Sequence, residues 1–212
     1  GDFYGSGRNE LLIAKALKDR DRDAVTISVK FGALRDPAGA WLGIDGRPAA
    51  VKSFLAYTLN RLGTDHIDVY RLTRVAPAVP IEETIGAIAE MVEAGYVRHI
   101  GLSEAGADTI RRAAAVHPIS DLQIEYSLIS RGIEDEILPT VRELGIGFVA
   151  YSPLGRGFLT GKLRSLDQLA DDDFRHNQPR MQGDNLEANI AIVERIDALA
   201  AEKDATPAQI AL

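Results

Sequence analysis

The feature that most constrains this chain is a regular alternation of short β-type segments with longer segments of helical periodicity. The β-type segments are rich in branched residues and lie at 25–31, 67–72, 97–102, 122–127 and 147–152. Segments with apolar residues three and four apart lie at 9–17, 51–62, 81–94, 108–116 and 133–144. This order predicts βαβ units, and therefore a parallel sheet covered by helices.

Five such strands fit both an open doubly wound sheet and a closed (β/α)8 barrel. A dinucleotide-binding loop after a strand would favour the open sheet. Residues 5–10 begin like such a loop but lack its third glycine. We therefore do not expect a Rossmann fold.

Composition narrows the class of protein. The 212 residues are 46% apolar and 26% charged, which is typical of one globular domain, here expected over residues 1–212. The formal net charge of −7 argues against general affinity for nucleic acid or an anionic membrane. The chain has no cysteine, so it has no disulfides, thiol catalysis or cysteine-bound metal, and we expect a cytoplasmic protein. The four histidines show no metal-ligand spacing, and no metal is expected.

Two long stretches, 32–48 and 155–185, lack either periodicity and are expected to be loops. Both follow predicted strands, so in a barrel they would lie on the face where active sites are built. The first stretch contains the only tryptophan, Trp41. Near the end of the chain, Thr206, Pro207 and Gln209 have the pattern of a capped helix start.

Several consecutive motifs resemble the aldo-keto reductases, in the bacterial and plant branch related to potassium-channel β-subunits. These motifs are DFYGSGRNE, VKFG, NRLGTDHIDVY, PIEETIGAIAEMVEAGYVRHIGLSE, DLQIEYSLISRGIEDEILPTVRELGIGFVAYSPLGRGFLTGK and TPAQIAL. The resemblance implies a (β/α)8 TIM barrel, represented here from the tail of strand two through strand seven and its following helix. It also implies reduction of an aldehyde or ketone with NADP(H).

The resemblance assigns two catalytic residues. Tyr4 matches the family's tyrosine and Lys30 its lysine. Hydride delivery to a carbonyl leaves an alkoxide that needs a proton, and a nearby ammonium helps a phenol to give up its proton. The family's aspartate would precede Gly1, and its histidine position is Thr73. We expect this threonine, together with Trp41, to contact substrate.

The resemblance also assigns cofactor-binding residues, which lie on predicted strands or directly after them. Those expected at the nicotinamide carboxamide are Ser103, Glu104 and Gln123. Tyr151 is expected to stack on the nicotinamide ring. Those expected along the pyrophosphate are Ser152, Leu154, Gly155, Arg156 and Gly157.

Three functions remain open. The first is an NADPH-dependent carbonyl reductase acting on a small molecule, with Tyr4 as general acid assisted by Lys30. The second, favoured by Thr73, is a catalytically impaired, cofactor-binding sensor or regulatory subunit. The third is an inactive fragment.

Because the family comparison leaves strands one and eight outside this sequence, we expect the 212 residues alone to associate as a homo-oligomer or to be unstable.

Overall fold

The computed structural model describes residue 1 and residues 3–212, which fall into two compact units. The first unit consists of Gly1–Ile124 and Glu134–Val149, and the second of Glu125–Ile133 and Ala150–Leu212. The expectation of a single domain over residues 1–212 stays a prediction.

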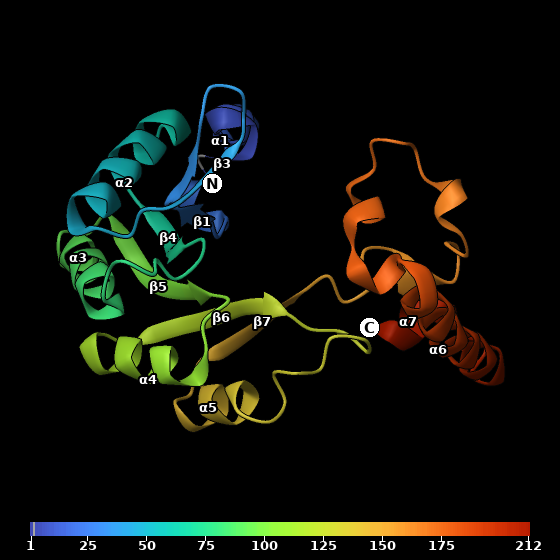
Figure 1. Cartoon of the computed structure of the whole chain (residues 1–212). Coiled ribbons are helices and arrows are strands. Elements are labelled where there is room, and N and C mark those ends of the chain that lie inside the picture. The colour runs from blue at the N-terminus through green and yellow to red at the C-terminus, as the bar shows by residue number, and fades with distance from the viewer. Residues whose placement is uncertain (2) are drawn as a thin grey trace. The chain divides into compact units, whose positions relative to one another are not determined.

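A sheet of five strands in consecutive order forms the centre of the fold (Figure 1). The strands are β1 (Ser28–Phe31), β4 (Ile67–Leu72), β5 (Val97–Ser103), β6 (Ile119–Glu125) and β7 (Gly147–Tyr151). The pairs β1–β4, β4–β5 and β5–β6 are parallel. This confirms the predicted parallel sheet, and an unbroken order of parallel strands is the arrangement of a (β/α)8 barrel wall.

Helices cover one face of this sheet in the order of the chain (Figure 1). They are α2 (Pro48–Leu62), α3 (Ile81–Glu93), α4 (Ala107–Val116) and α5 (Ile137–Glu143). The first unit also contains α1 (Arg8–Leu17) and the 3-10 helices η1 (Tyr4–Gly7) and η2 (Arg22–Ala24). Exposed ion pairs join α2 to α3, α3 to α4 and α4 to α5, and because solvent screens them they add little to stability.

The hydrophobic core lies between the sheet and these helices, because alternate strand residues point toward them. Phe31 of β1 stacks on Tyr70 of β4, with 4.1 Å between ring centroids. The Tyr70 hydroxyl donates a hydrogen bond to the Val51 carbonyl of α2 at 3.0 Å. Burial of these aromatic side chains fixes which strand face points to the helices.

The stretch expected to be the first loop contains a β-hairpin instead. Strands β2 (Ala33–Arg35) and β3 (Trp41–Ile44) pair antiparallel. Asp36 closes the turn by accepting a hydrogen bond from the Ala40 N–H at 2.8 Å, and Gly39 has a φ of 87°. The glycines and proline that made this stretch look irregular therefore serve a turn and its flanks.

The second unit has a core of its own around a long helix. Its elements are η3 (Phe158–Thr160), η4 (Leu166–Gln168), η5 (Phe174–Asn177), η6 (Pro179–Met181), α6 (Gly183–Glu202) and α7 (Pro207–Ala211). Its buried core residues are Phe158, Leu159, Leu163, Met181, Val193 and Ile196. The second expected loop is thus largely a series of 3-10 turns, and α6 was not predicted. The predicted cap of α7 is confirmed, since the Thr206 hydroxyl accepts a hydrogen bond from the Gln209 N–H.

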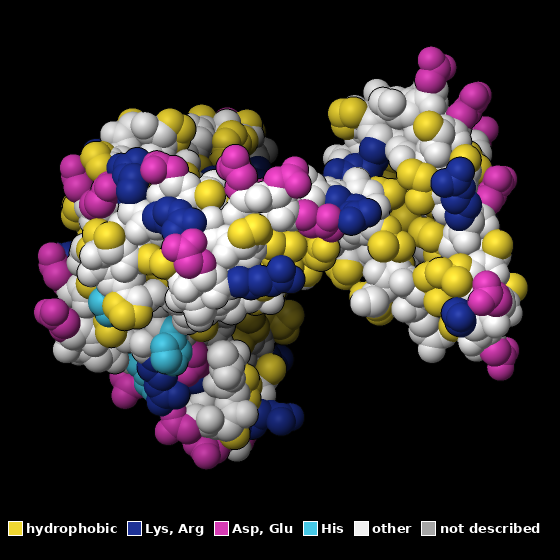
Figure 2. Space-filling view, turned by 90° about the horizontal axis from the view of Figure 1, so that it is seen from below, with side chains coloured by type: hydrophobic (Ala, Val, Ile, Leu, Met, Phe, Trp, Pro, Cys, Tyr) yellow, Lys and Arg dark blue, Asp and Glu magenta, His cyan; other side chains and the backbone are white. Residues whose placement is uncertain are grey.

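Acidic and basic side chains are interspersed on the face of the surface seen in Figure 2. Among the described residues, no helix is both long and apolar enough to span a membrane.

Candidate active site

Three of the predicted site residues lie on the inner face of the sheet, opposite the helices. Ser103, the last residue of β5, is directly paired with Gln123 of β6. Lys30 is paired with Arg71 of β4, two residues before Thr73. Paired residues of neighbouring strands point to the same side, so alternation places Lys30, Ser103 and Gln123 on one face near the carboxyl ends of their strands.

A row of polar residues crosses this inner face below Ser103. Lys30, Arg71 and Asp121 form this row on β1, β4 and β6. Gly101 of β5 is paired with both Arg71 and Asp121 and lies between them. Arg71 is buried, and its Nη2 lies 2.7 Å from the Asp121 carboxylate. A Cβ on Gly101 would lie 3.1 Å from the Arg71 Nε, so glycine leaves the space through which the guanidinium reaches β6.

The electrostatic environment of Lys30 makes its charged form costly. Burial, followed by the nearby guanidiniums of Arg74 and Arg71, lowers the pKa of Lys30 to about 8, against an opposing effect of Glu104. Burial also lowers the pKa of Arg71, which Asp121 partly offsets. A lysine with a pKa near neutrality can gain or lose a proton under physiological conditions.

Tyr4 lies in a turn that is anchored beside Lys30. A Cβ on Gly1 would lie 2.7 Å from the Lys30 carbonyl oxygen, so these two backbones are in direct contact. The Tyr4 N–H donates a hydrogen bond to the Gly1 carbonyl at 3.2 Å. The Tyr4 side chain is 50% exposed and packs on Phe3, with 4.2 Å between ring centroids. Its accessible phenol is therefore carried by a segment adjoining the carboxyl end of β1.

Thr73 does not present a free hydroxyl to the inner face. Its side chain is buried, and its Oγ1 donates a hydrogen bond to the Phe31 carbonyl at 2.8 Å. Its backbone N–H donates to the same oxygen at 2.8 Å. Thr73 thus joins the ends of β1 and β4 with its one hydroxyl proton, so its hydroxyl can only accept a further hydrogen bond. Its expected contact with substrate stays a prediction.

Left-handed backbone conformations occur at several of the predicted positions. The five non-glycine residues with positive φ among those described are Ser6, Glu104, Ser152, Arg156 and Asp204. Such conformations are costly for residues with a Cβ and are concentrated at functional sites. Glu104 is held in this conformation directly after β5, where its N–H donates to the Gln123 carbonyl at 3.0 Å.

Within the second unit, the segment after β7 folds into a tight turn. Besides Ser152 and Arg156, the glycines Gly155 and Gly157 have positive φ. The Gly155 N–H donates to the Ser152 carbonyl at 2.8 Å, and the Leu154 carbonyl accepts from Gly157 at 3.1 Å. Tyr151 immediately precedes this turn as the last residue of β7.

The side chain of Arg156 contains a nitrogen that has no hydrogen-bond partner among the described residues. Its Nε is buried and makes no hydrogen bond within the described chain. Its guanidinium lies over the Phe174 ring, with 5.1 Å between Cζ and the ring centroid. A buried cationic donor without a partner is costly unless an acceptor approaches it.

Trp41, expected to contact substrate, lies at the start of the second hairpin strand. It is 50% exposed, and the Arg35 guanidinium lies 5.7 Å from its ring centroid. A hydrogen bond holds the end of the hairpin next to the end of β1, because the Asp45 N–H donates to the Gly32 carbonyl at 2.8 Å. The hairpin thus begins directly after the strand that carries Lys30.

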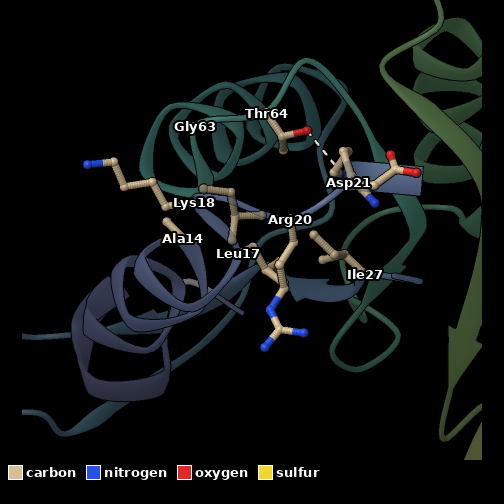
Figure 3. A pocket seen from close by; sticks show the side chains of 10 residues that line it. Ala14, Leu17, Lys18, Arg20, Asp21, Ile27, Gly63 and Thr64 are labelled. Atoms are coloured by element: carbon tan, nitrogen blue, oxygen red, sulfur yellow. Dashed lines mark hydrogen bonds between the residues drawn. The ribbon is translucent and has the colours of Figure 1, made fainter. Parts of the chain in front are cut away.

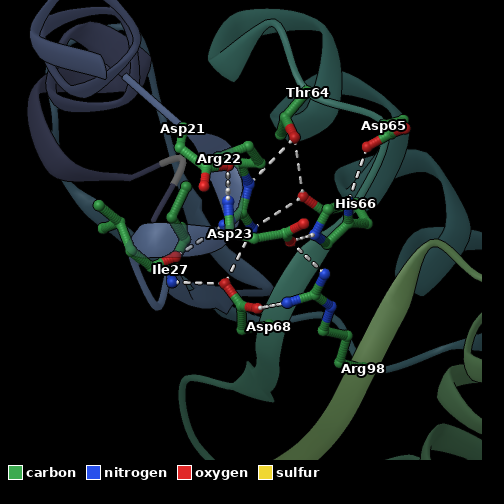
Figure 4. A network of polar contacts seen from close by, with 10 residues as sticks. Asp21, Arg22, Asp23, Ile27, Thr64, Asp65, His66, Asp68 and Arg98 are labelled. Carbon is green, nitrogen blue, oxygen red and sulfur yellow. Dashed lines mark hydrogen bonds and ion pairs between the residues drawn. The ribbon is translucent and has the colours of Figure 1, made fainter.

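The opposite ends of the strands contain none of the predicted site residues. A pocket of about 340 Å³ lies there between the end of α1 and the end of α2, with Arg20 and Ile27 among its lining residues (Figure 3). Beside it, Asp68 at the start of β4 binds the side chains of Arg22 and Arg98 (Figure 4). In barrels of this kind the amino-terminal ends of strands serve stability, and these groups fit that role.

Three charged residues near the predicted site were not identified from the sequence. They are Arg71, Arg74 and Asp121. A signal was present, because an arginine within the apolar run IDVYRL must find a partner when the strand is buried. The described residues contain no group of three or more side chains suited to hold a metal ion.

Comparisons with known proteins agree with this architecture. The model of the Aldo/keto reductase family matches residues 1–212. The chain is 49% identical over 211 residues to "Probable aldo-keto reductase 1" of Glycine max, covering all of this chain and 60% of that protein. The chain therefore spans less than two thirds of this relative's length.

Solved structures give the same result. A glycerol dehydrogenase from Gluconobacter oxydans superposes with a TM-score of 0.90 at 26% identity, over 99% of this chain and 65% of that one. A thermostable aldo-keto reductase in complex with the inhibitor epalrestat gives 0.71 at 28% identity, over 99% and 63%. An aldo-keto reductase from Bacillus halodurans in its holo form gives 0.69 at 31% identity, over 81% and 55%. Because the family model matches all 212 residues, this chain belongs to the aldo/keto reductase family.

Proposed function

We propose that this protein reduces an aldehyde or ketone to an alcohol with NADPH, and that Tyr4 and Lys30 carry the proton chemistry. The observation that supports this most is the arrangement in the first unit. Lys30, Ser103 and Gln123 share the inner face of the sheet near its carboxyl edge, and the Tyr4 turn contacts the Lys30 backbone. Active sites of barrel enzymes are built at this edge.

The chain has residues suited to hold a nicotinamide cofactor. The buried Arg156 Nε has no acceptor among the described residues, and the surrounding turn contains glycines that allow close approach of a phosphate. We assign Arg156 and its neighbours Ser152, Leu154, Gly155 and Gly157 to the pyrophosphate. We assign Ser103, Glu104 and Gln123 to the carboxamide and Tyr151 to the nicotinamide ring. When bound, NADPH supplies the hydride that the carbonyl carbon accepts.

In this proposal the side chains of the first unit manage the proton. The Tyr4 hydroxyl donates its proton to the carbonyl oxygen as negative charge develops there. The Lys30 ammonium stabilises the phenolate left behind. Because the Thr73 hydroxyl is bound to the Phe31 carbonyl, no side chain at that position shares a proton with the substrate. We therefore expect slower turnover than a histidine at this position would give.

The same Thr73 contact favours one alternative, a cofactor-binding sensor or regulatory subunit with impaired catalysis.

The main proposal also includes a preference for NADPH over NADH, a cytoplasmic location and association between copies. The absence of cysteine supports a reducing compartment. The acidic balance of the chain fits a small-molecule substrate better than a polyanionic partner.

The proposal is tested by NADPH fluorescence titration and aldehyde turnover, using the protein in its natural full length. Tyr4→Phe and Lys30→Met should each lower kcat by about 10²–10⁴ fold while NADPH still binds, because each removes proton transfer or its support. Tyr57→Phe, an exposed tyrosine of α2, and Lys52→Met are matched controls that should keep wild-type turnover. Binding without turnover in the wild type would support the sensor, and loss of both would support an inactive fragment.

A further inference from the structure

Arg74, directly after Thr73, is an exposed cation at this edge of the sheet. Its side chain is exposed, and its Nη1 donates to the Thr73 carbonyl at 2.7 Å. The same nitrogen reaches the Ser103 hydroxyl at 3.5 Å. The guanidinium therefore lies between the ends of β4 and β5, next to a residue assigned to the carboxamide.

Arg74 differs from the arginines of β4 and β5 in having no acidic partner among the described residues. Arg71 is 2.7 Å from Asp121, and Arg98 is 2.9 Å from Asp68. Within the described chain, no carboxylate lies within ion-pair distance of Arg74. Its remaining N–H groups are available to an acceptor from outside the protein.

The surrounding charges favour an anion at this position. Lys30 and Arg71 add two further cations, and Arg74 is close enough to Lys30 to lower the pKa of that lysine. The Asp121 carboxylate is already bound to Arg71, which leaves Glu104 as the nearby negative charge. An anionic ligand would relieve the repulsion among these cations.

We propose that Arg74 binds an anionic group of the carbonyl substrate, so that the preferred substrates are aldehydes or ketones that carry a carboxylate. A planar guanidinium pairs with a carboxylate through two parallel hydrogen bonds, which fixes both position and orientation. This inference rests on the proposed reductase function. Arg74 is a specificity residue in it, since the proton chemistry belongs to Tyr4 and Lys30.

The test compares two aldehydes of similar size, 4-carboxybenzaldehyde and the uncharged methyl 4-formylbenzoate. The ratio of their kcat/KM values should favour the carboxylate in the wild type and fall at least about tenfold in Arg74→Met, since one charge-assisted pair is lost. Arg74→Lys should recover part of the ratio, because it keeps the charge without the fork. Arg20→Met, at the opposite end of the strands, should leave the ratio unchanged.

A binding measurement separates failure of this inference from failure of the proposed function. Isothermal titration of 4-(hydroxymethyl)benzoate into NADP⁺-loaded protein should show affinity at least about tenfold weaker in Arg74→Met than in the wild type. Activity with both aldehydes and an unchanged ratio in Arg74→Met would overturn the role of Arg74 alone. A weaker NADPH affinity with an unchanged ratio would also overturn it, since the charge would then serve the cofactor. If neither aldehyde is reduced, the reductase proposal fails and the titration alone decides on Arg74.

Discussion

Lys30 is the residue on which the proposed proton chemistry depends most directly. Burial, Arg74 and Arg71 bring its pKa to about 8, so the ammonium is present below that pH and is lost above it. We expect kcat/KM for an uncharged aldehyde to fall as the pH rises through about 8. In Arg74→Met the pKa of Lys30 should rise, because one repelling charge is gone, and the fall should move to higher pH. A profile that stays flat to strongly alkaline pH would contradict this role of the ammonium.

Asp68 has a corresponding role in stability. Burial would raise the pKa of this carboxyl, but the Ile27 N–H and the guanidiniums of Arg22 and Arg98 outweigh it and hold the pKa below 3.8. The stability that Asp68 contributes is therefore present above pH 3.8 and is lost as the pH falls through the lower, folded-state value.

Asp68→Asn should consequently lower the free energy of unfolding by about 2 kcal/mol at pH 7. Urea denaturation at pH 7 and in acid measures this, with the exposed Asp19→Asn as control. The difference from wild type should shrink in acid, where Asp68 is protonated in both states. A difference of equal size at both pH values would show that the charge of Asp68 is not the cause.

Some individual site residues could be predicted from the sequence and others could not. Lys30 could be proposed because the family resemblance assigns it, and a lysine ending an apolar strand also needs water or a partner. Arg74 could not be proposed from the sequence. The residues around it in the chain do not show which side chains the neighbouring strand end places beside it. The commitment of the Thr73 hydroxyl to the Phe31 carbonyl likewise depends on the pairing of two distant strands.

Among the elements, β5 leaves room for the side chains of β4 at Gly101. A Cβ there would lie 3.0 Å from the Val69 side chain and 3.1 Å from the Arg71 Nε. We expect Gly101→Ala to lower the free energy of unfolding by about 1–3 kcal/mol through this crowding. Gly86→Ala is a matched control, because a Cβ at Gly86 of α3 meets nothing within 4 Å and alanine favours a helix. Equal midpoints of thermal unfolding for the two variants would contradict this packing account.

The elements with clear periodicity were predictable, and those without it were not. The strand Ile67–Leu72 has the bounds expected from its apolar run, and the other four strands match within a few residues. The hairpin of β2 and β3 was missed, because three- and four-residue strands carry too little alternation. The 3-10 turns of the second unit were missed for the same reason, since their order comes from packing on Phe158 and Leu159.

At the scale of the whole molecule, each unit carries its own share of the proposed cofactor residues. Gln123 belongs to the first unit, and Arg156 to the second. Gln123→Ala and Arg156→Met should each weaken NADPH binding, the second by about tenfold, because a charge-assisted bond is lost. Arg195→Met, an exposed change on α6, should have no effect in the same fluorescence titration. Unchanged NADPH affinity in Arg156→Met would contradict the assignment of this turn to the pyrophosphate.

The central claim is that these residues support hydride transfer to a carbonyl, with Tyr4 supplying the proton. Single-turnover reduction of an aldehyde with NADPH deuterated at the reactive C4 position tests this most directly. We predict that the alcohol carries deuterium at the former carbonyl carbon and that its formation slows at least about a hundredfold in Tyr4→Phe. Protein that binds the labelled cofactor but transfers no deuterium to any aldehyde would contradict the claim.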